Sequence, residues 1–293
     1  MRKLISRRRF LRKSSTAVGA TASLLAVRRT DGGESTRPSG RIRRAVKFHM
    51  IQERLPVVDK FKLLKDLGFE GTEIHVTEKV DKEEVRRAID ATGVVVHGFL
   101  NSSKPDLKFA IDRAKFYGAT SVLVVAGRVT EDSPYDQVYR QQQQRIKAAL
   151  PYAEQTGVKL LIENVWNNFL LSPLEMARFI DELESPAAGA YFDVGNVVRF
   201  GWPDHWIRIL GHRIVKLDIK GYSRKKQMRE GPRKGFDVAI GEGDCNWPAV
   251  RQALADVGYT SGWATAEVRG GDRRRLAEIA EQMDRVLQLT ADR

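Results

Sequence analysis

Short runs of β-branched and other apolar residues alternate along the chain with longer segments of helical periodicity, starting near Arg44. This alternation is typical of parallel β-α-β construction, in which a helix returns the chain from the end of one strand to the start of the next. The apolar runs predict eight strands, over residues 45–51, 71–76, 94–99, 121–126, 158–164, 189–195, 214–220 and 262–268. The expected helices span 59–67, 81–91, 105–117, 135–156, 172–184, 204–210, 247–257 and 272–289.

Helix-ending and helix-starting residues support this division. Ser172 and Pro173 supply a cap and a first-turn proline, and Gly157 stands where the longest helix should stop. An open doubly wound sheet would alternate in the same way. However, no glycine-rich phosphate loop follows the first strand, and eight units close naturally into a barrel. The sequence therefore predicts one α/β domain, a (β/α)₈ barrel over residues 44–293.

The positive charge of the chain lies almost entirely before this barrel. The net charge is +13, and residues 1–44 hold 13 Lys and Arg against two acidic residues, a net of +11. A domain that binds nucleic acid should carry its surplus where it meets the phosphates, so no nucleic-acid partner is expected. The single cysteine, Cys245, excludes an intrachain disulfide and a cysteine-based zinc site.

The N-terminus reads SRRRFLRK from Ser6 and continues with a mildly apolar stretch over 15–27, which is too short to span a bilayer as a mature helix. This pattern resembles a twin-arginine export signal, and a basic disordered arm is the alternative. We expect residues 1–30 to be the signal and 31–43 a disordered linker. The resemblance implies export to the periplasm or another extracytoplasmic space, with no stable membrane span once the signal is removed.

Each of the last four predicted strands has an acidic residue at or near its C-terminal end: Glu163, Asp193, Asp218 and Glu267. In a barrel, these ends surround one mouth. An isolated carboxylate in an apolar strand would cost several kcal/mol or become neutral, so four on adjacent strands indicate a shared cation. Carboxylate oxygens suit Mg²⁺ or Mn²⁺, with Zn²⁺ a further option. The alternative is that some of these acids cap helices or pair with Arg and Lys.

Several motifs together resemble the xylose isomerase-like sugar isomerase and epimerase barrels, over residues 44 to 289. They are LGFEGTEIH, LLIENVW, YFDVGN, KLDIK, IGEGDCNW and AEV. The resemblance implies that the four carboxylates occupy the metal-ligand positions of the family. It also implies that Glu163 and Glu267 form the acid/base pair that moves a proton next to a metal-bound carbonyl, through an enediolate.

The sequence departs from this family pattern at two places. Where the seventh strand usually offers His-x-Lys-Asp, this chain has Asp218-Ile219-Lys220-Gly221, and Asn196 stands where several epimerases place a histidine that contacts the substrate. A site of four carboxylates is harder than one containing histidine, which favours Mn²⁺ or Mg²⁺ over Zn²⁺.

The expected function is a divalent-metal-dependent sugar isomerase or epimerase, a monomer or a homo-oligomer, acting on a sugar or keto-sugar. Six residues are expected to contact that substrate: Glu73, His75, His97, Asn196, Lys220 and Arg269. The basic segment from Ser223 to Lys234 is expected to be a long solvated loop, with binding of an anionic substrate as the alternative, and its length is compatible with a lid. Three alternatives stay open: a lyase or dehydratase on inososes or keto-sugars, an exported sugar-binding barrel without catalysis, and a metal-dependent endonuclease, which would need more histidines than the five present.

Overall fold

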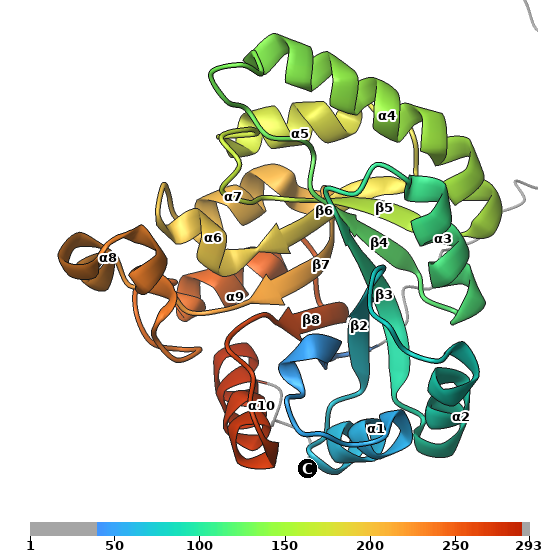
Figure 1. Ribbon diagram of the computed structural model, residues 1–293. Helices are drawn as coiled ribbons and strands as arrows, with labels where there is room; N and C mark the ends of the chain where they lie inside the picture. Colours follow the sequence, from blue (N-terminus) through green and yellow to red (C-terminus); the bar gives the residue numbers. More distant parts are fainter. Residues whose placement is uncertain (1–39, 289–293) are drawn as a thin grey trace, which may run out of the picture. The chain divides into compact units, whose positions relative to one another are not determined.

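A computed structural model describes residues 40–288 and shows a closed barrel of parallel strands in the order β1 to β8, with β8 pairing back to β1 (Figure 1). The strands are β1 Ile42–Lys47, β2 Gly71–His75, β3 Val95–Ser102, β4 Ser121–Val124, β5 Lys159–Glu163, β6 Ala188–Asp193, β7 Ile214–Ile219 and β8 Gly262–Ala266. The predicted (β/α)₈ barrel is confirmed. The predicted export signal over residues 1–30 lies outside the described residues, as does the predicted linker up to residue 39.

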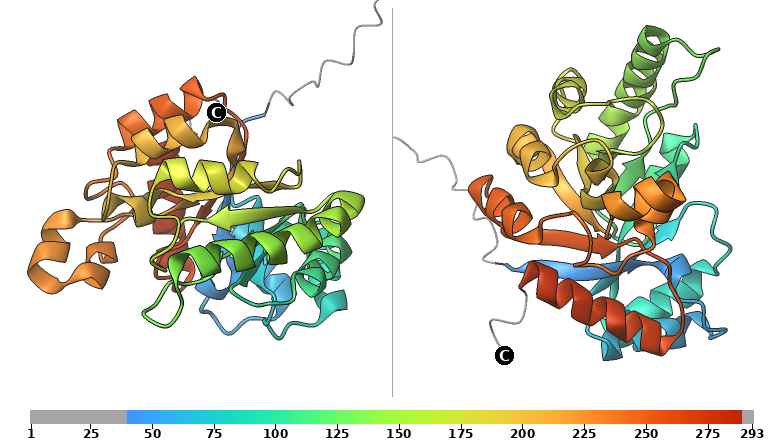
Figure 2. Two further views of the ribbon diagram at one scale, coloured as in Figure 1. Left: turned by 90° about the horizontal axis from the view of Figure 1, so that it is seen from above. Right: turned by 90° about the vertical axis from the view of Figure 1, so that its left-hand side faces the viewer.

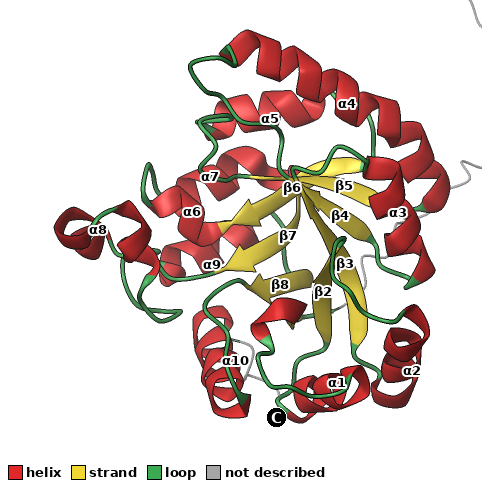
Figure 3. Cartoon of the chain, viewed as in Figure 1, coloured by secondary structure: helices red, strands yellow, loops and turns green. Residues whose placement is uncertain are grey.

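Helices surround the strands on the outside of the barrel (Figure 3). They are α1 Val57–Asp66, α2 Lys82–Thr92, α3 Leu107–Phe116, α4 Tyr135–Thr156, α5 Pro173–Asp181, α6 Val194–Val198, α7 Pro203–Leu210, α8 Arg224–Glu230, α9 Trp247–Asp256 and α10 Arg273–Leu287. Ser172 caps α5 as expected, accepting a hydrogen bond from the backbone of Glu175. No helix among residues 40–288 has both the length and the apolar character needed to cross a bilayer.

The differences from the expected elements have simple causes. The first strand ends at Lys47, and Phe48–Met50 forms a 3-10 turn (η1). The apolar run continues into this turn because Phe48 and Met50 are themselves buried. Helix α6 was expected as strand and loop, since its residues VGNVV carry no helical pattern. Helix α8 lies in the segment expected as a loop and buries none of its residues, so it has no apolar face to reveal it. It projects beyond the ring of helices (Figure 2).

The main apolar core fills the space between the strands and the helices, with fully buried side chains such as Phe61, Phe179 and Ile279. The interior of the barrel differs. It holds only a small apolar cluster of Leu100, Leu123, Leu161 and Tyr191, while most of its other side chains are polar or charged. Side chains two residues apart on a strand share a face, so each interior layer collects one residue from each of several strands. The barrel interior therefore stacks a polar layer beneath the mouth.

Candidate active site

Four carboxylates meet at the C-terminal mouth of the barrel. Glu163, Asp193 and Asp218 lie at the ends of β5, β6 and β7, and Glu267 follows β8 directly. One oxygen atom from each lies within 4.8 Å of the others. The strand register explains this, since Asp193 on β6 pairs directly with Asp218 on β7. The structure thus brings together all four predicted ligands, called the mouth cluster below.

A side-chain amide fixes the backbone that carries Asp193. The Asn164 side chain donates to the carbonyl of Asp193 (2.8 Å) and accepts from its N–H (2.8 Å), which extends the pairing of β5 and β6 by one residue. Asp193 Oδ1 accepts from the backbone of Asn196 (2.8 Å) and caps α6. The capping alternative therefore holds for one oxygen of Asp193, and its other oxygen, Oδ2, faces the site.

Two lysines pair with three members of the mouth cluster. Lys220 Nζ lies 2.6 Å from Asp193 Oδ2 and also contacts Glu267. Lys47 is fully buried, and its Nζ lies 2.8 Å and 3.0 Å from the two oxygens of Asp218. The stem of Lys220 crosses the start of α6 at Gly195, where a Cβ atom would lie only 2.2 Å from Lys220 Cγ. A side chain at position 195 would displace this lysine.

Glu163 differs from the other three carboxylates. Its side chain makes no hydrogen bond and no ion pair with any residue that the structure describes, although Glu163 is only 7% exposed. Burial, together with the charges of Glu267, Asp218 and Asp193, raises the pKa of Glu163 well above its usual value. For Glu267, burial also raises the pKa, but the ammonium groups of Lys220 and Lys47 outweigh it and set the pKa at about 2.

The charges of the region do not balance. Five carboxylates lie in the mouth cluster or directly beneath it: Glu73, Glu163, Asp193, Asp218 and Glu267. Three lysines lie among them: Lys47, Lys216 and Lys220. Burial lowers the pKa of Lys216 to about 7, so at neutral pH this side chain is only partly charged. With all five carboxylates ionised, the region lacks at least two positive charges. A divalent cation would supply both charges, and it prefers hard oxygen donors such as these carboxylates.

Beneath the mouth cluster lies a closed polar layer, the floor network, made of Lys47, Glu73, Tyr191, Thr265, His97 and Lys216. Its contacts run from Lys47 Nζ to Glu73 Oε2 (2.7 Å), Tyr191 OH to Glu73 Oε2 (2.9 Å), Tyr191 OH to Thr265 Oγ1 (2.9 Å), Thr265 Oγ1 to His97 Nε2 (3.3 Å) and Lys216 Nζ to His97 Nδ1 (2.9 Å). Burial and the charges of Lys216 and Lys47 lower the pKa of His97 well below its usual value, so its ring is neutral.

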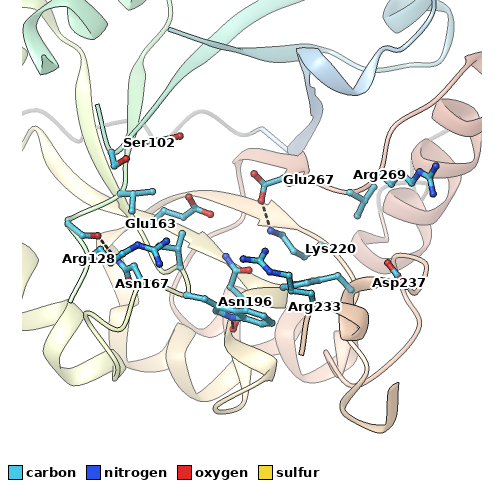
Figure 4. A pocket seen from close by; sticks show the side chains of 17 residues that line it. Ser102, Arg128, Glu163, Asn167, Asn196, Lys220, Arg233, Asp237, Glu267 and Arg269 are labelled. Atoms are coloured by element: carbon cyan, nitrogen blue, oxygen red, sulfur yellow. Dashed lines mark hydrogen bonds and ion pairs between the residues drawn. The ribbon is translucent and has the colours of Figure 1, made fainter. Parts of the chain in front are cut away.

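A cavity of about 780 Å³ opens above the mouth cluster (Figure 4). Among the residues predicted to contact a substrate, Asn196, Lys220 and Arg269 line this cavity together with Glu163 and Glu267. The other three do not line it. Glu73 and His97 belong to the floor network, and the ring of His75 bonds to Thr77 at the edge of the barrel (2.6 Å). Trp166 lines the cavity, where its ring packs at a tilt of 33° against Phe236, with centroids 4.9 Å apart.

Four residues of the site escaped the sequence analysis. Lys47 and Lys216 carried a readable signal, because a lysine in the middle of the apolar runs AVKFHMI and IVKLDIK needs a buried partner. Arg128, which also lines the cavity, carried none, whereas Arg233 belongs to the basic segment 223–234, for which binding of an anionic substrate was the alternative. Both arginines lie outside the regular strands, where hydrophobic periodicity gives no information about the direction of a side chain.

One known protein family matches most of this chain. The family model described as "Xylose isomerase-like TIM barrel" matches residues 61–289. None of the curated proteins matches the sequence.

Solved structures resemble the fold. A D-allulose 3-epimerase from Methylomonas sp. superposes with a TM-score of 0.69 at 14% identity, over 84% of this chain and 98% of the other. The 3-keto-D-glucoside 4-epimerase from E. coli gives 0.66 at 14% identity, over 84% and 99%. A probable 3-DHS dehydratase from Bacillus anthracis gives 0.66 at 16% identity, over 82% and 98%. At such identities the likeness concerns the fold.

Proposed function

Because the chain belongs to the xylose isomerase-like TIM barrel family, we propose that it is a divalent-metal-dependent sugar isomerase or epimerase. The observation that carries this proposal is the unpaired Glu163 carboxylate, buried beside three other carboxylates that have only two lysines in contact with them. A carboxylate in that position must be neutralised by a proton or by a cation. The four oxygens suit a hard divalent ion, and we propose Mn²⁺ or Mg²⁺.

The divalent ion would draw electron density from the carbonyl and hydroxyl oxygens of a sugar and so acidify the neighbouring C–H bond. Glu163 and Glu267 then act as the acid/base pair at the cavity wall, one removing the proton and the other returning it. The pKa values of the two carboxyl groups are shifted in opposite directions, as an acid and a base in one site require. The pKa of Glu163 is raised by burial and neighbouring acids, whereas Lys220 and Lys47 keep Glu267 ionised.

The other residues of the site hold these groups in place. Lys47 binds both oxygens of Asp218 and so orients this carboxylate toward the mouth. The side chain of Asn196 donates to the carbonyl of Asn164 (3.0 Å), and the Trp166 indole donates to the carbonyl of Asn196 (2.9 Å). These contacts set one wall of the cavity, where the ammonium of Lys220 can meet sugar oxygens and the rings of Trp166 and Phe236 exclude water.

The N-terminal sequence supports a further proposal, that the enzyme acts outside the cytoplasm after export through a twin-arginine pathway. A substrate in that compartment would be an extracellular or periplasmic carbohydrate.

Elemental analysis of purified protein, followed by a deuterium-exchange screen, tests the proposed function. The protein loaded with Mn²⁺ is incubated in D₂O with ketoses, keto-acids and inososes, and the recovered compounds are weighed by mass spectrometry. We expect about one metal ion per chain and gain of one deuterium without loss of water. Loss of water would instead identify a lyase, and absence of exchange with every bound sugar would remove the enzyme proposal. More than one ion per chain would favour the endonuclease alternative.

Two variants sharpen this screen. Glu267→Gln should abolish exchange and leave the circular dichroism spectrum unchanged, because the amide keeps the shape but cannot accept the proton. Glu131→Gln is the matched control, since Glu131 is exposed and does not line the cavity. Equal exchange in the two variants would exclude Glu267 from the acid/base pair.

A further inference from the structure

Two arginines at the rim of the cavity extend the proposed function to a class of substrate. Resting on that function, we propose that the substrate is a ketose with an anionic group, a carboxylate or a phosphate, at the end remote from its carbonyl. Arg128 and Arg233 would bind this group while the carbonyl end lies over the mouth cluster. The inference comes from the opposite charges at the two ends of the cavity, from the hydrogen bonds that hold the backbone at both arginines, and from the lack of an ion pair between either arginine and a described acid.

The sign of the charge on the cavity lining changes from the deep end to the rim. Its deep end is formed by the carboxylates of Glu163 and Glu267, and its rim includes Arg128 and Arg233. Figure 4 shows the guanidinium groups of both arginines extending toward the middle of the cavity, whereas that of Arg269 points away from it. Neither Arg128 nor Arg233 makes a hydrogen bond or an ion pair through its side chain with the residues that the structure describes.

The backbone at Arg128 is held on both sides by the loop after β5. The side chain of Asn167 donates to the carbonyl of Gly127 (2.8 Å), and the backbone of Val129 donates to the carbonyl of Asn167 (3.0 Å). Asn168 also donates to the carbonyl of Val129 (3.2 Å). An exposed arginine on a free loop would lose much entropy on binding an anion. Here the main chain is already fixed, which reduces that cost to the side chain alone.

The turn that carries Arg233 is held in a similar way by Tyr222. The Tyr222 hydroxyl donates to the carbonyl of Pro232 (3.0 Å), and the backbone of Ser223 donates to the carbonyl of Gly235 (2.8 Å). Gly235 lies flat on the tyrosine ring, where a Cβ atom would come within 2.4 Å of it. Tyr222 is itself fully buried, so the 3-10 turn Pro232–Phe236 (η3) is anchored to the barrel.

No acid of the cavity lining makes an ion pair with either arginine among the described residues. Asp237 pairs with Lys234 (3.0 Å), and Glu267 pairs with Lys220. Glu163 belongs to the mouth cluster and lies with the other carboxylates. A cavity that is negative at its deep end and positive at its rim matches a ligand with oxygen donors at one end and an anion at the other. Guanidinium groups recognise carboxylates and phosphates through paired N–H donors.

Three ketoses that differ only at C6 test the inference: D-fructose, D-fructuronate and D-fructose 6-phosphate. Binding to the Mn²⁺-loaded full-length protein is measured by isothermal titration calorimetry at 50 mM and 500 mM NaCl. We expect at least one anionic ketose to bind about 10-fold more tightly than D-fructose, with the preference reduced at high salt because exposed charges are screened. Which anion binds better distinguishes carboxylate from phosphate. Equal binding of all three sugars, or the absence of binding by both anionic ones, would overturn the inference.

The variant Arg128→Gln/Arg233→Gln locates the preference. It should bind the anionic ketose no more than about 2-fold better than it binds D-fructose, whereas the control Arg229→Gln, on α8 and outside the cavity lining, should keep the preference of the parent. A preference that persists in the double variant would refute the assignment. Deuterium exchange is followed in parallel, so that anion preference without exchange refutes the proposed function alone, and exchange with D-fructose without anion preference refutes this inference alone.

Discussion

The mouth cluster and the floor network are two layers of one barrel interior, and both take residues from β6 and β7. Tyr191 and Asp193 belong to one strand, and Lys216 and Asp218 to the next, each pair two positions apart. The floor joins its charged groups through a continuous series of hydrogen bonds. The mouth leaves Glu163 without a partner in the described part of the chain.

This contrast teaches where to look for function in a charged barrel. Burial and unusual residue types occur in both layers, so neither separates structure from chemistry. Incomplete pairing does separate them, because a buried carboxylate without a partner is stable only if something else supplies the charge. Lys47 links the layers, since it contacts Glu73 below and Asp218 above.

The largest effect is expected from breaking the floor. Lys47→Met removes the ammonium that pairs with Glu73 and Asp218, both buried, and should lower the free energy of unfolding by roughly 3–5 kcal/mol, as for other broken buried ion pairs. Urea denaturation of the metal-free protein measures this. Lys225→Met, at an exposed position of α8, is the control and should change stability little. A loss below about 1 kcal/mol for Lys47→Met would mean that the floor is not the structural layer.

A substitution in the mouth cluster should have the opposite effect on the free energy of unfolding. Glu163→Gln replaces a carboxyl group whose ionised form is disfavoured by its acidic neighbours with a neutral amide, so the metal-free protein should be as stable as the parent or more stable, while Mn²⁺ binds about 100-fold more weakly. Calorimetric titration with Mn²⁺ and urea denaturation give the two quantities. Glu131→Gln should leave both unchanged. If Glu163→Gln destabilised the protein as strongly as Lys47→Met, the two layers would not differ in role.

Lys220 should compete with the metal, since its ammonium contacts Asp193 and Glu267. Lys220→Met is expected to raise Mn²⁺ affinity about 10-fold, because a divalent ion no longer displaces a positive charge from two of its ligands. Lys220→Arg keeps the charge and serves as the comparison. Weaker Mn²⁺ binding by the methionine variant would show that Lys220 supports the metal site.

The smallest expected effect is on the number of protons that the protein releases when it binds Mn²⁺. In the metal-free protein the raised pKa of Glu163 means that this group holds a proton at pH values where an ordinary glutamate has lost it. Metal binding must release that proton, so Mn²⁺ affinity should rise with pH below the raised pKa and level off above it. Calorimetry in buffers of different ionisation enthalpy counts the protons released. Parent protein should release at least one more than Glu163→Gln, and equal release would contradict the assignment.

Much of the fold could be predicted because hydrophobic periodicity reports on strands and helices that bury one face. The eight strands, the main helices and the convergence of the four carboxylates follow from that pattern and from barrel geometry. Pairing could not be predicted, because it depends on which side chain of a distant strand points inward at the same level. Thus Glu73 and His97 were expected to meet a substrate, whereas the structure places them beneath the site. Arg128 and Arg233 depend on loop geometry, which periodicity does not describe.

Helix α8 buries none of its own residues, and the turn after it carries Arg233 on an anchor formed by Tyr222. Within this helix, Arg224 donates to the carbonyls of Val198 and Gly201, whereas residues 225–230 bury no side chain against the barrel, so their identity should contribute little to its stability. Descendants of this gene could exchange that segment for another, longer or differently charged, without disturbing the four carboxylates. Diversification of substrate choice and preservation of the chemistry would then proceed on separate stretches of the chain, at different evolutionary rates.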